Sequence, residues 1–366
     1  MIVVAEIGTS HGGSIAKAKA LIEAASDAGA DAVKLQWVYA DEILHPDTGS
    51  VDLPAGKVRL YDRFKQVEVA ADFFSDCLSY AHQKKMQFIC SPFGLKSFAE
   101  LAAIKPDAIK IASPELNHFP LLRAVADWRK TNDTPLILSS GVSTLADIEA
   151  ALSITGIHKV TLLHCITSYP APESEYNLRL IKSLSQIFGV KTGISDHSLD
   201  PVLVPSLSAA MGGEMIEKHI TLSKETDGLD DPVALTPEQF AHMCYCVHQC
   251  EAMIRRYSLT CGGDNITEEM ENQYGREKVQ AVLGDGVKRL AESERANYGR
   301  TNRSLHFMRA MKKGDRIAPQ DIAVLRTEKV LTPGLGPQFL EQVIGALLTR
   351  DVANGSGLQW DDVITS

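Results

Sequence analysis

The stretch that decides the fold is Gly193-Ile194-Ser195-Asp196-His197, which has a counterpart later in the chain in Glu217-Lys218-His219-Ile220. Each histidine ends an apolar run of strand length, so two adjacent parallel strands would bring both histidines to the same end of a sheet. Two imidazoles with open positions suit a borderline divalent cation that also holds water or a substrate oxygen. The alternative is a pair of ordinary histidines satisfied by neighbouring groups. The pairing of the two strand ends favours the metal site.

The same unit of strand, polar break and amphipathic helix recurs from the first residue to about residue 260. The predicted strands are 2–7, 32–36, 87–91, 108–112, 136–139, 160–164, 190–194 and 215–219. Helices predicted between them include 15–28, 98–104, 121–130, 145–154 and 202–211. This alternation favours a closed (β/α)8 TIM barrel. A doubly wound open sheet is the alternative, but no glycine-rich dinucleotide fingerprint follows the first strand.

The rest of the chain divides into further segments. The stretch 39–66 carries Pro46, Gly49, Pro54 and Gly56 and predicts a long loop that acts as a lid or a substrate contact. We expect a catalytic barrel over 1–262, a helical or extended linker over 263–302 and a compact, turn-rich domain over 303–366. The last of these is small for independent stability, so we expect it to dock onto a partner surface.

The composition is that of a soluble globular protein, with 45% hydrophobic and 23% charged residues. A net charge of −9 argues against nucleic-acid binding, which depends on a surplus of Lys and Arg. No signal-peptide pattern and no apolar run of about 18 residues is present, so we expect a cytoplasmic protein without a membrane partner. The seven cysteines are expected to be reduced. Cys244, Cys246, His248 and Cys250 suggest a zinc site, but a packed helix is the favoured interpretation.

Polar residues end almost every predicted strand, where barrels of this kind place their chemistry. They are Glu6, Lys34, Gln36, Ser91, Lys110, Ser113, Glu115, Ser139, Ser140, His164, Ser195, His197, Glu217 and His219. Side chains alternate along a strand, so Lys34 should point the same way as Gln36, and Glu217 the same way as His219. A lysine in an apolar strand is costly unless it meets an anion. Lys34 and Lys110 with a ring of serines therefore predict a pocket for phosphate and carboxylate.

Other roles for the same residues stay open at this point. Lys110 could pair with a barrel carboxylate, and the serines could cap the helices that follow them. Capping is compatible with anion binding, because a helix N-terminus offers N–H groups to a phosphate. Glu6 could be a structural partner of a lysine or a catalytic acid–base group.

At these residues the sequence resembles the sialic acid synthase (N-acetylneuraminate synthase) family. The matching motifs are Ala5-Glu6-Ile7-Gly8, His11-Gly12-Gly13, Val33-Lys34-Leu35-Gln36, Ser91-Pro92-Phe93, Ile109-Lys110-Ile111-Ala112-Ser113, Ser139-Ser140-Gly141-Val142, Leu163-His164-Cys165, Tyr169-Pro170, Ser195-Asp196-His197 and Glu217-Lys218-His219. The C-terminal segment resembles the antifreeze-like (SAF) module of that family through Asn302-Arg303-Ser304-Leu305, Lys312-Lys313-Gly314 and Pro333-Gly334-Leu335-Gly336. The resemblance covers essentially the whole chain.

The resemblance implies a transferase that condenses phosphoenolpyruvate with an N-acetylated aminohexose of the N-acetylmannosamine type. The product would be a nine-carbon 2-keto-3-deoxy sialic acid, formed with release of phosphate. A divalent metal is implied as cofactor, with Mn²⁺ as the first candidate and Mg²⁺ or Co²⁺ as alternatives. The resemblance also implies a domain-swapped homodimer, in which the SAF module of one chain covers the barrel mouth of the other.

The family's roles carry over onto matching positions of this sequence. His197 and His219 would hold the metal. The catalytic residues would be Glu6, Lys34, Lys110 and Glu115. The substrate-binding residues would be Gln36, Ser91, Ser113, Ser139, Thr167, Tyr169, Ser195, Glu217, Asp230 and Arg303. Arg303 is expected to reach across the dimer to the acyl group of the sugar.

The sequence departs from the family's pattern where the sugar would bind. Thr9-Ser10-His11 replaces the usual Ile-Asn-His, Thr167 replaces an Asn, and Gly228-Leu229-Asp230-Asp231 replaces Gly-Pro-Asp-His. Alternative acceptors are therefore precursors of legionaminic or pseudaminic type acids and 6-phosphorylated sugars. A metal-dependent aldolase or hydrolase on the same barrel is a rival within enzymes, and a catalytically inactive binding protein is a rival from another class.

Overall fold

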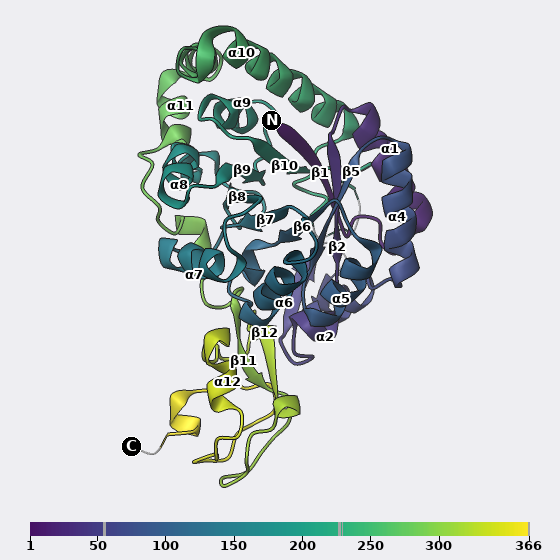
Figure 1. Ribbon diagram of the computed structural model, residues 1–366, viewed down its shortest axis with the longest axis vertical. Coiled ribbons are helices and arrows are strands. Elements are labelled where there is room, and N and C mark those ends of the chain that lie inside the picture. The colour runs from purple at the N-terminus through teal and green to yellow at the C-terminus, as the bar shows by residue number, and fades with distance from the viewer. Residues whose placement is uncertain (54–55, 226–227, 229, 365–366) are drawn as a thin grey trace.

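The computed structural model describes residues 1–53, 56–225, 228 and 230–364. Eight parallel strands close into a barrel in the order β1-β10-β9-β8-β7-β6-β5-β2 (Figure 1). Their bounds are β1 (Ile2–Gly8), β2 (Ala32–Trp37), β5 (Gln87–Pro92), β6 (Ala108–Ile111), β7 (Leu136–Ser139), β8 (Val160–Cys165), β9 (Lys191–Asp196) and β10 (Met215–His219). All eight predicted strands are present, so the closed barrel is confirmed and the open sheet is excluded.

Helices surround the strands and shield their outer faces from water (Figure 1). They are α1 (Ile15–Asp27), α4 (Ala71–Gln83), α5 (Leu95–Ile104), α6 (Phe119–Arg129), α7 (Leu145–Thr155), α8 (Leu180–Phe188), α9 (Leu203–Ala210), α10 (Pro237–Tyr274) and α11 (Arg276–Leu283). In α7, Thr144 and Asp147 form a capping box at the first turn. The same helix buries Ile148, Ala151 and Leu152, a helical spacing that turns one face toward the barrel.

The two irregular segments of the chain are ordered in parts. The stretch 39–66 contains α2 (Ala40–Ile43), a hairpin of β3 (Ser50–Leu53) and β4 (Gly56–Arg59), and α3 (Leu60–Lys65), while Pro54 lies outside the described residues. The predicted boundary at residue 262 falls inside α10, whose backbone departs from helical geometry at Ser258, where φ is 77°. The zinc-like cysteines and histidine lie on α10, as the helical interpretation predicts.

The barrel interior is built in layers, and this positions the site. An apolar layer consists of Val4, Ala32, Ile89, Ala108, Ile137, Leu163 and Met215. Two residues further along the same strands stand Glu6, Lys34, Ser91, Lys110, Ser139, Cys165 and Glu217. Because the strand period is two residues, this polar layer faces the same interior, directly beyond the apolar one. The buried polar and charged side chains of the barrel are therefore concentrated at the carboxyl ends of the strands.

The C-terminal domain has its own small core and docks on the barrel beside α2 and α6 (Figure 1). Its antiparallel strands β11 (Arg303–Phe307) and β12 (Ile322–Arg326) pair with each other. Asn117 of the barrel exchanges two hydrogen bonds of 2.9 Å with the backbone of Arg303. Among the helices that the structure describes, none has the length and hydropathy needed to cross a bilayer.

Candidate active site

A cavity of about 40 Å³ lies at the carboxyl end of the barrel. Most of the predicted site residues line it, among them Glu6, Lys34, Gln36, Lys110, Ser113, Thr167, Tyr169, Ser195, His197, Glu217 and His219. The expected shared orientations of Lys34 with Gln36 and of Glu217 with His219 are confirmed, since all four contribute to this one cavity. The period of the strands thus brings residues from distant parts of the sequence to one place.

Two lysines and two carboxylates form the floor of the cavity. Lys34 Nζ lies 2.7 Å from Glu6 Oε2 and 3.6 Å from Glu217 Oε1. Lys110 Nζ donates to Glu217 Oε1 at 2.9 Å, and Ser195 Oγ donates to the same oxygen at 3.0 Å. Lys110 therefore pairs with a barrel carboxylate, Glu217, as the alternative interpretation of the sequence predicts. All four charged groups are nearly fully buried, and their charges balance.

Burial and pairing set the protonation of this cluster. Burial raises the pKa of Glu6, and the nearby charge of Lys34 only partly offsets that rise. Burial also disfavours ionised Glu217, but Lys110 and Lys34 outweigh it and lower the pKa of Glu217 to about 2. Burial would lower the pKa of Lys34, but Glu217 and Glu6 outweigh it and raise that pKa. Glu6 is thus the member of this cluster that most easily changes charge.

The two histidines lie side by side above the charged cluster. The ring centroids of His197 and His219 are 5.5 Å apart, and Tyr169 stacks on His197 at 4.2 Å. Burial lowers the pKa of both imidazoles, so both are neutral near pH 7. His197 Nδ1 lies 2.8 Å from the carbonyl oxygen of Ile166. A carbonyl only accepts, so Nδ1 carries the proton and Nε2 keeps a lone pair for a ligand.

Other potential metal ligands are sparse around the histidines. His219 Nδ1 is 3.9 Å from Asp230 Oδ2, and burial raises the pKa of Asp230 to about 6. Within residues 1–53, 56–225, 228 and 230–364, no group of three or more His, Cys, Asp or Glu side chains forms a ready cluster for a metal. Two neutral imidazoles nevertheless fit a metal that takes its remaining ligands from water or substrate.

A buried network behind the cavity fixes the position of His197. Lys218 and Asp196 point away from the interior and form a 2.6 Å ion pair that is inaccessible to solvent. Tyr176 donates its hydroxyl proton to Asp196 at 2.7 Å and accepts the backbone N–H of His197 at 2.7 Å. The alternation of β9 and β10 therefore gives each strand one side that lines the cavity and one side that supports it.

The predicted serines serve different purposes. Ser91 Oγ accepts from Lys34 Nζ at 3.5 Å, and Ser113 Oγ accepts from the N–H of Gly141 at 3.0 Å. Ser139 Oγ and Thr167 Oγ1 are buried and have no hydrogen-bond partner among the described residues. The N-caps of the described α-helices are other residues, so helix capping does not explain the serines. An unpartnered buried hydroxyl is costly, and a bound ligand would remove that cost.

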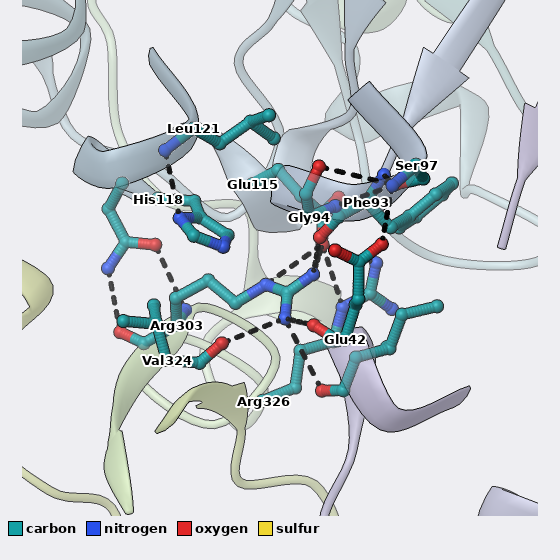
Figure 2. A network of polar contacts seen from close by, with 12 residues as sticks. Glu42, Phe93, Gly94, Ser97, Glu115, His118, Leu121, Arg303, Val324 and Arg326 are labelled. Carbon is teal, nitrogen blue, oxygen red and sulfur yellow. Dashed lines mark hydrogen bonds and ion pairs between the residues drawn. The ribbon is translucent and has the colours of Figure 1, made fainter. Parts of the chain in front are cut away.

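Glu115 and Arg303 contact each other (Figure 2), and neither is among the residues that line the cavity of about 40 Å³. Arg303 Nε and Nη2 donate to Glu115 Oε1 at 3.2 and 2.9 Å, and Arg326 donates to the same oxygen at 3.0 and 2.7 Å. Nη2 of Arg303 also donates to the carbonyl of Phe93, and Nη1 donates to that of Val324. The donors of Arg303 are thus used within its own chain. Its predicted contact with a sugar across a dimer stays a prediction.

A second cavity of about 190 Å³ adjoins the first. Its lining comprises Thr9, Gln36, Phe64, Phe93, Ala112, Pro114, Thr167, Tyr169, Asp230, Thr301 and Arg326. Gln36, Thr167 and Tyr169 line both cavities, so the two are contiguous. Larger surface hollows exist near α10 and α11, and His164 is the one polar strand-end residue of the sequence analysis among the residues that line them.

The sequence patterns do not identify every residue that lines the two cavities, and they leave the direction of the His164 side chain open. Phe64, Phe93 and Arg326 come from loops and from the C-terminal domain, so no strand pattern reveals them. His164 is among the polar residues that end the predicted strands, but its Nε2 contacts the carbonyl oxygen of Tyr176, outside the barrel. Its neighbour Cys165 lines the cavity instead, because Leu163 and Cys165 share the interior face.

Comparison with known proteins finds two family models along the chain. The model of the NeuB family matches residues 21–258, and that of the SAF domain matches residues 302–364. The chain is 31% identical to the spore coat polysaccharide biosynthesis protein SpsE of Bacillus subtilis, over 100% of this chain and 94% of that protein. It is 28% identical to an N,N'-diacetyllegionaminic acid synthase of Campylobacter jejuni, over 96% of each chain. The crystal structure of SpsE superposes with a TM-score of 0.83 at 30% identity and covers 100% of this chain and 95% of that one.

Proposed function

Because this chain belongs to the NeuB family, we propose that it condenses phosphoenolpyruvate with an N-acetylated aminohexose. The product is a nine-carbon 2-keto-3-deoxy acid of the sialic acid class, and phosphate is released. The observation that carries the proposal is the convergence of Lys34, Lys110, His197 and His219 on one buried cavity. The two lysines and the unpartnered hydroxyls of Ser139 and Thr167 favour this reaction over that of a metal-dependent aldolase or hydrolase.

The lysines bind the anionic groups of phosphoenolpyruvate. Lys34 and Lys110 now face Glu6 and Glu217, so an incoming carboxylate and phosphate share these cations with the protein. Ser139 and Thr167 offer hydroxyl donors that have no acceptor among the described residues. The pKa of Glu6 is raised by burial, so Glu6 takes up a proton when further negative charge arrives. This proton offsets one of the negative charges that phosphoenolpyruvate brings into the cavity.

His197 and His219 are the proposed metal ligands, with Mn²⁺ as the first candidate and Mg²⁺ or Co²⁺ as alternatives. When bound, such an ion supplies Lewis-acid polarisation of the aldehyde oxygen of the open-chain sugar. The hydrogen bond from His197 Nδ1 to Ile166 fixes the ring and leaves Nε2 as the nitrogen that would hold the ion. Tyr169 covers His197 and helps to exclude water from the site.

The reaction forms one carbon–carbon bond and replaces the C2–O bond to phosphate by a C2–O bond to the oxygen of water. C3 of phosphoenolpyruvate attacks C1 of the aldehyde, water adds at C2, and the C2–O bond to phosphate breaks. The two protons of water end on the new hydroxyl group and on the released phosphate. Glu6 is placed to carry one of them, because it lines the cavity and burial raises its pKa. Lys34 stabilises the negative charge that develops nearby.

Phosphate release tests the proposal directly. The protein is incubated with phosphoenolpyruvate and a panel of aminohexoses, in Mn²⁺ and after chelation. We expect phosphate release only when an N-acetylated aminohexose and the metal are both present. Turnover of a sugar without consumption of phosphoenolpyruvate indicates the aldolase or hydrolase. Binding of phosphoenolpyruvate without any turnover across the panel indicates an inactive binding protein.

A further inference from the structure

The connecting segment, residues 284–302, leads from α11 past α8 and α7 to β11 (Figure 1). Glu294 of this segment is inaccessible to solvent. Its Oε1 accepts the backbone N–H of Val142 at 2.8 Å and that of Thr167 at 2.7 Å. Val142 belongs to the loop after β7 and Thr167 to the loop after β8, so one carboxylate ties two barrel loops together. A buried carboxylate is costly without donors, and here the barrel supplies them.

Val142 has a backbone conformation that β-branched residues rarely adopt, with φ at 42°. Its N–H is held by Glu294, and its carbonyl oxygen accepts the amide of Asn302 at 3.0 Å. Two residues earlier, the carbonyl oxygen of Ser140 accepts Lys288 Nζ at 3.1 Å. A strained conformation persists only where the surrounding contacts fix it. The connecting segment therefore determines the shape of the loop after β7.

Gly141, next to Val142, brings this loop against hydroxyl groups of the site. Its N–H donates to Ser113 Oγ at 3.0 Å. A Cβ atom at Gly141 would lie 2.1 Å from Thr167 Oγ1 and 2.9 Å from Ser113 Oγ, so the glycine backbone packs directly against both hydroxyl groups. Ser113 and Thr167 line the cavity of about 40 Å³, and Thr167 Oγ1 has no hydrogen-bond partner among the described residues. A shift of Val142 would therefore displace the donors that the cavity offers to an anion.

We propose that Glu294 is a positioning residue for phosphoenolpyruvate, with Asn302 as its partner on the same loop. By holding the loops after β7 and β8, it places the hydroxyl groups of Ser113 and Thr167 where they bind the anionic groups of this substrate. Glu294 is not among the residues that line either cavity, so it acts through the N–H groups that it holds. The inference rests on the proposed function and deepens it, because a segment outside the barrel becomes part of the anion site.

The first experiment compares two substitutions of Glu294 in the full-length protein. Phosphoenolpyruvate is titrated calorimetrically into the wild type, Glu294→Ala and Glu294→Gln, and steady-state constants are measured with N-acetylmannosamine as acceptor. We expect Glu294→Ala to raise the Kd and KM of phosphoenolpyruvate about tenfold or more, while the acceptor KM changes less than about twofold. Glu294→Gln should retain most of the affinity, because its amide oxygen still accepts both N–H groups.

Glu292→Ala is the matched control. Glu292 lies in the same turn, η3 (Glu292–Glu294), where its side chain is 74% exposed and pairs with Arg295. This substitution should change neither KM. The Tm of each variant is measured as well, so that loss of the fold is separated from loss of affinity.

Three outcomes overturn the proposal. If folded Glu294→Ala binds phosphoenolpyruvate as the wild type does, Glu294 only anchors the connecting segment. If both KM values rise equally, the effect is a general one on the fold. If Glu294→Gln loses as much affinity as Glu294→Ala, the charge matters and the accepted N–H groups do not.

Asn302→Ala keeps the proposal testable if Glu294→Ala does not fold. It removes one neutral hydrogen bond from the carbonyl of Val142 and alters no charge. We expect it to raise the Kd of phosphoenolpyruvate about threefold or more, and an unchanged Kd overturns the proposal. Failure of the proposed function is distinct, because the wild type then releases no phosphate with any acceptor, whatever affinities the variants show.

Discussion

Replacing Lys110 with Met tests the charged floor of the cavity through the titration of Glu217. The folded-state pKa of Glu217 is about 2, against an ordinary value of 4.5. This depressed pKa stabilises the fold above about pH 4.5, and the contribution is lost as the pH falls toward 2; its full size is on the order of 3 kcal/mol. Lys110 is the largest cause of the depression, ahead of Lys34. Lys110→Met should raise the folded pKa of Glu217 and remove most of this contribution.

We expect Lys110→Met to unfold about 2–4 kcal/mol more easily than the wild type at pH 7. Lys34 at 3.6 Å and Ser195 at 3.0 Å still satisfy Glu217, so the variant should fold. The same change should raise the phosphoenolpyruvate KM about tenfold to a hundredfold and leave the acceptor KM nearly unchanged.

Urea unfolding from about pH 7 to about pH 3, together with steady-state kinetics, measures both effects. The difference in unfolding free energy between wild type and variant should narrow as the pH falls below about 4.5. Lys191→Met is the matched control, since Lys191 forms an exposed 2.8 Å pair with Glu214 at the other end of β9. A difference that stays constant with pH, or a KM that rises equally for both substrates, refutes the reasoning.

Three further predictions concern the metal ligands, the supporting network and the C-terminal domain. His197→Ala or His219→Ala should fold normally but lose Mn²⁺ binding and turnover; unchanged activity after chelation and Mn²⁺ replenishment contradicts the site. Lys218→Met should cost about 3–5 kcal/mol in urea unfolding, because it leaves Asp196 charged and unpaired in the core; a loss below about 1 kcal/mol would contradict that. Removal of residues 303–366 takes Arg303 and Arg326 away from Glu115. The truncated protein should still bind phosphoenolpyruvate in calorimetry but should lose most sugar turnover.

The sequence predicts the barrel well because its strands repeat a simple pattern. In β10, Met215, Glu217 and His219 alternate with residues that face the helices, and that alternation alone fixes which side chains share the interior. The pattern fails where both faces of a strand are apolar. In β8 the neighbours of His164 are buried whichever way they point, so the sequence leaves the direction of its side chain undecided.

Pairings between distant segments are beyond the reach of sequence patterns. The contact of Glu6 with Lys34 depends on the register of β1 against β2, which includes an irregularity between Glu6 and Gly8. Arg326 reaches its cavity only because the C-terminal domain docks on α2 and on the loop after β6. Such docking depends on the complementarity of side chains on two surfaces, and no periodic pattern in the sequence predicts it.

The apolar layer beneath the charged residues closes the interior of the barrel. Val4, Ile89, Ile137 and their neighbours fill the barrel from wall to wall, so molecules cannot pass through it from the other end. The buried lysines are therefore reached from the carboxyl ends of the strands, where the cavity of about 190 Å³ adjoins the cavity that the lysines line. For the proposed reaction we therefore expect an ordered mechanism, in which phosphoenolpyruvate binds before the sugar. A sugar that binds first would block the access of phosphoenolpyruvate to the lysines.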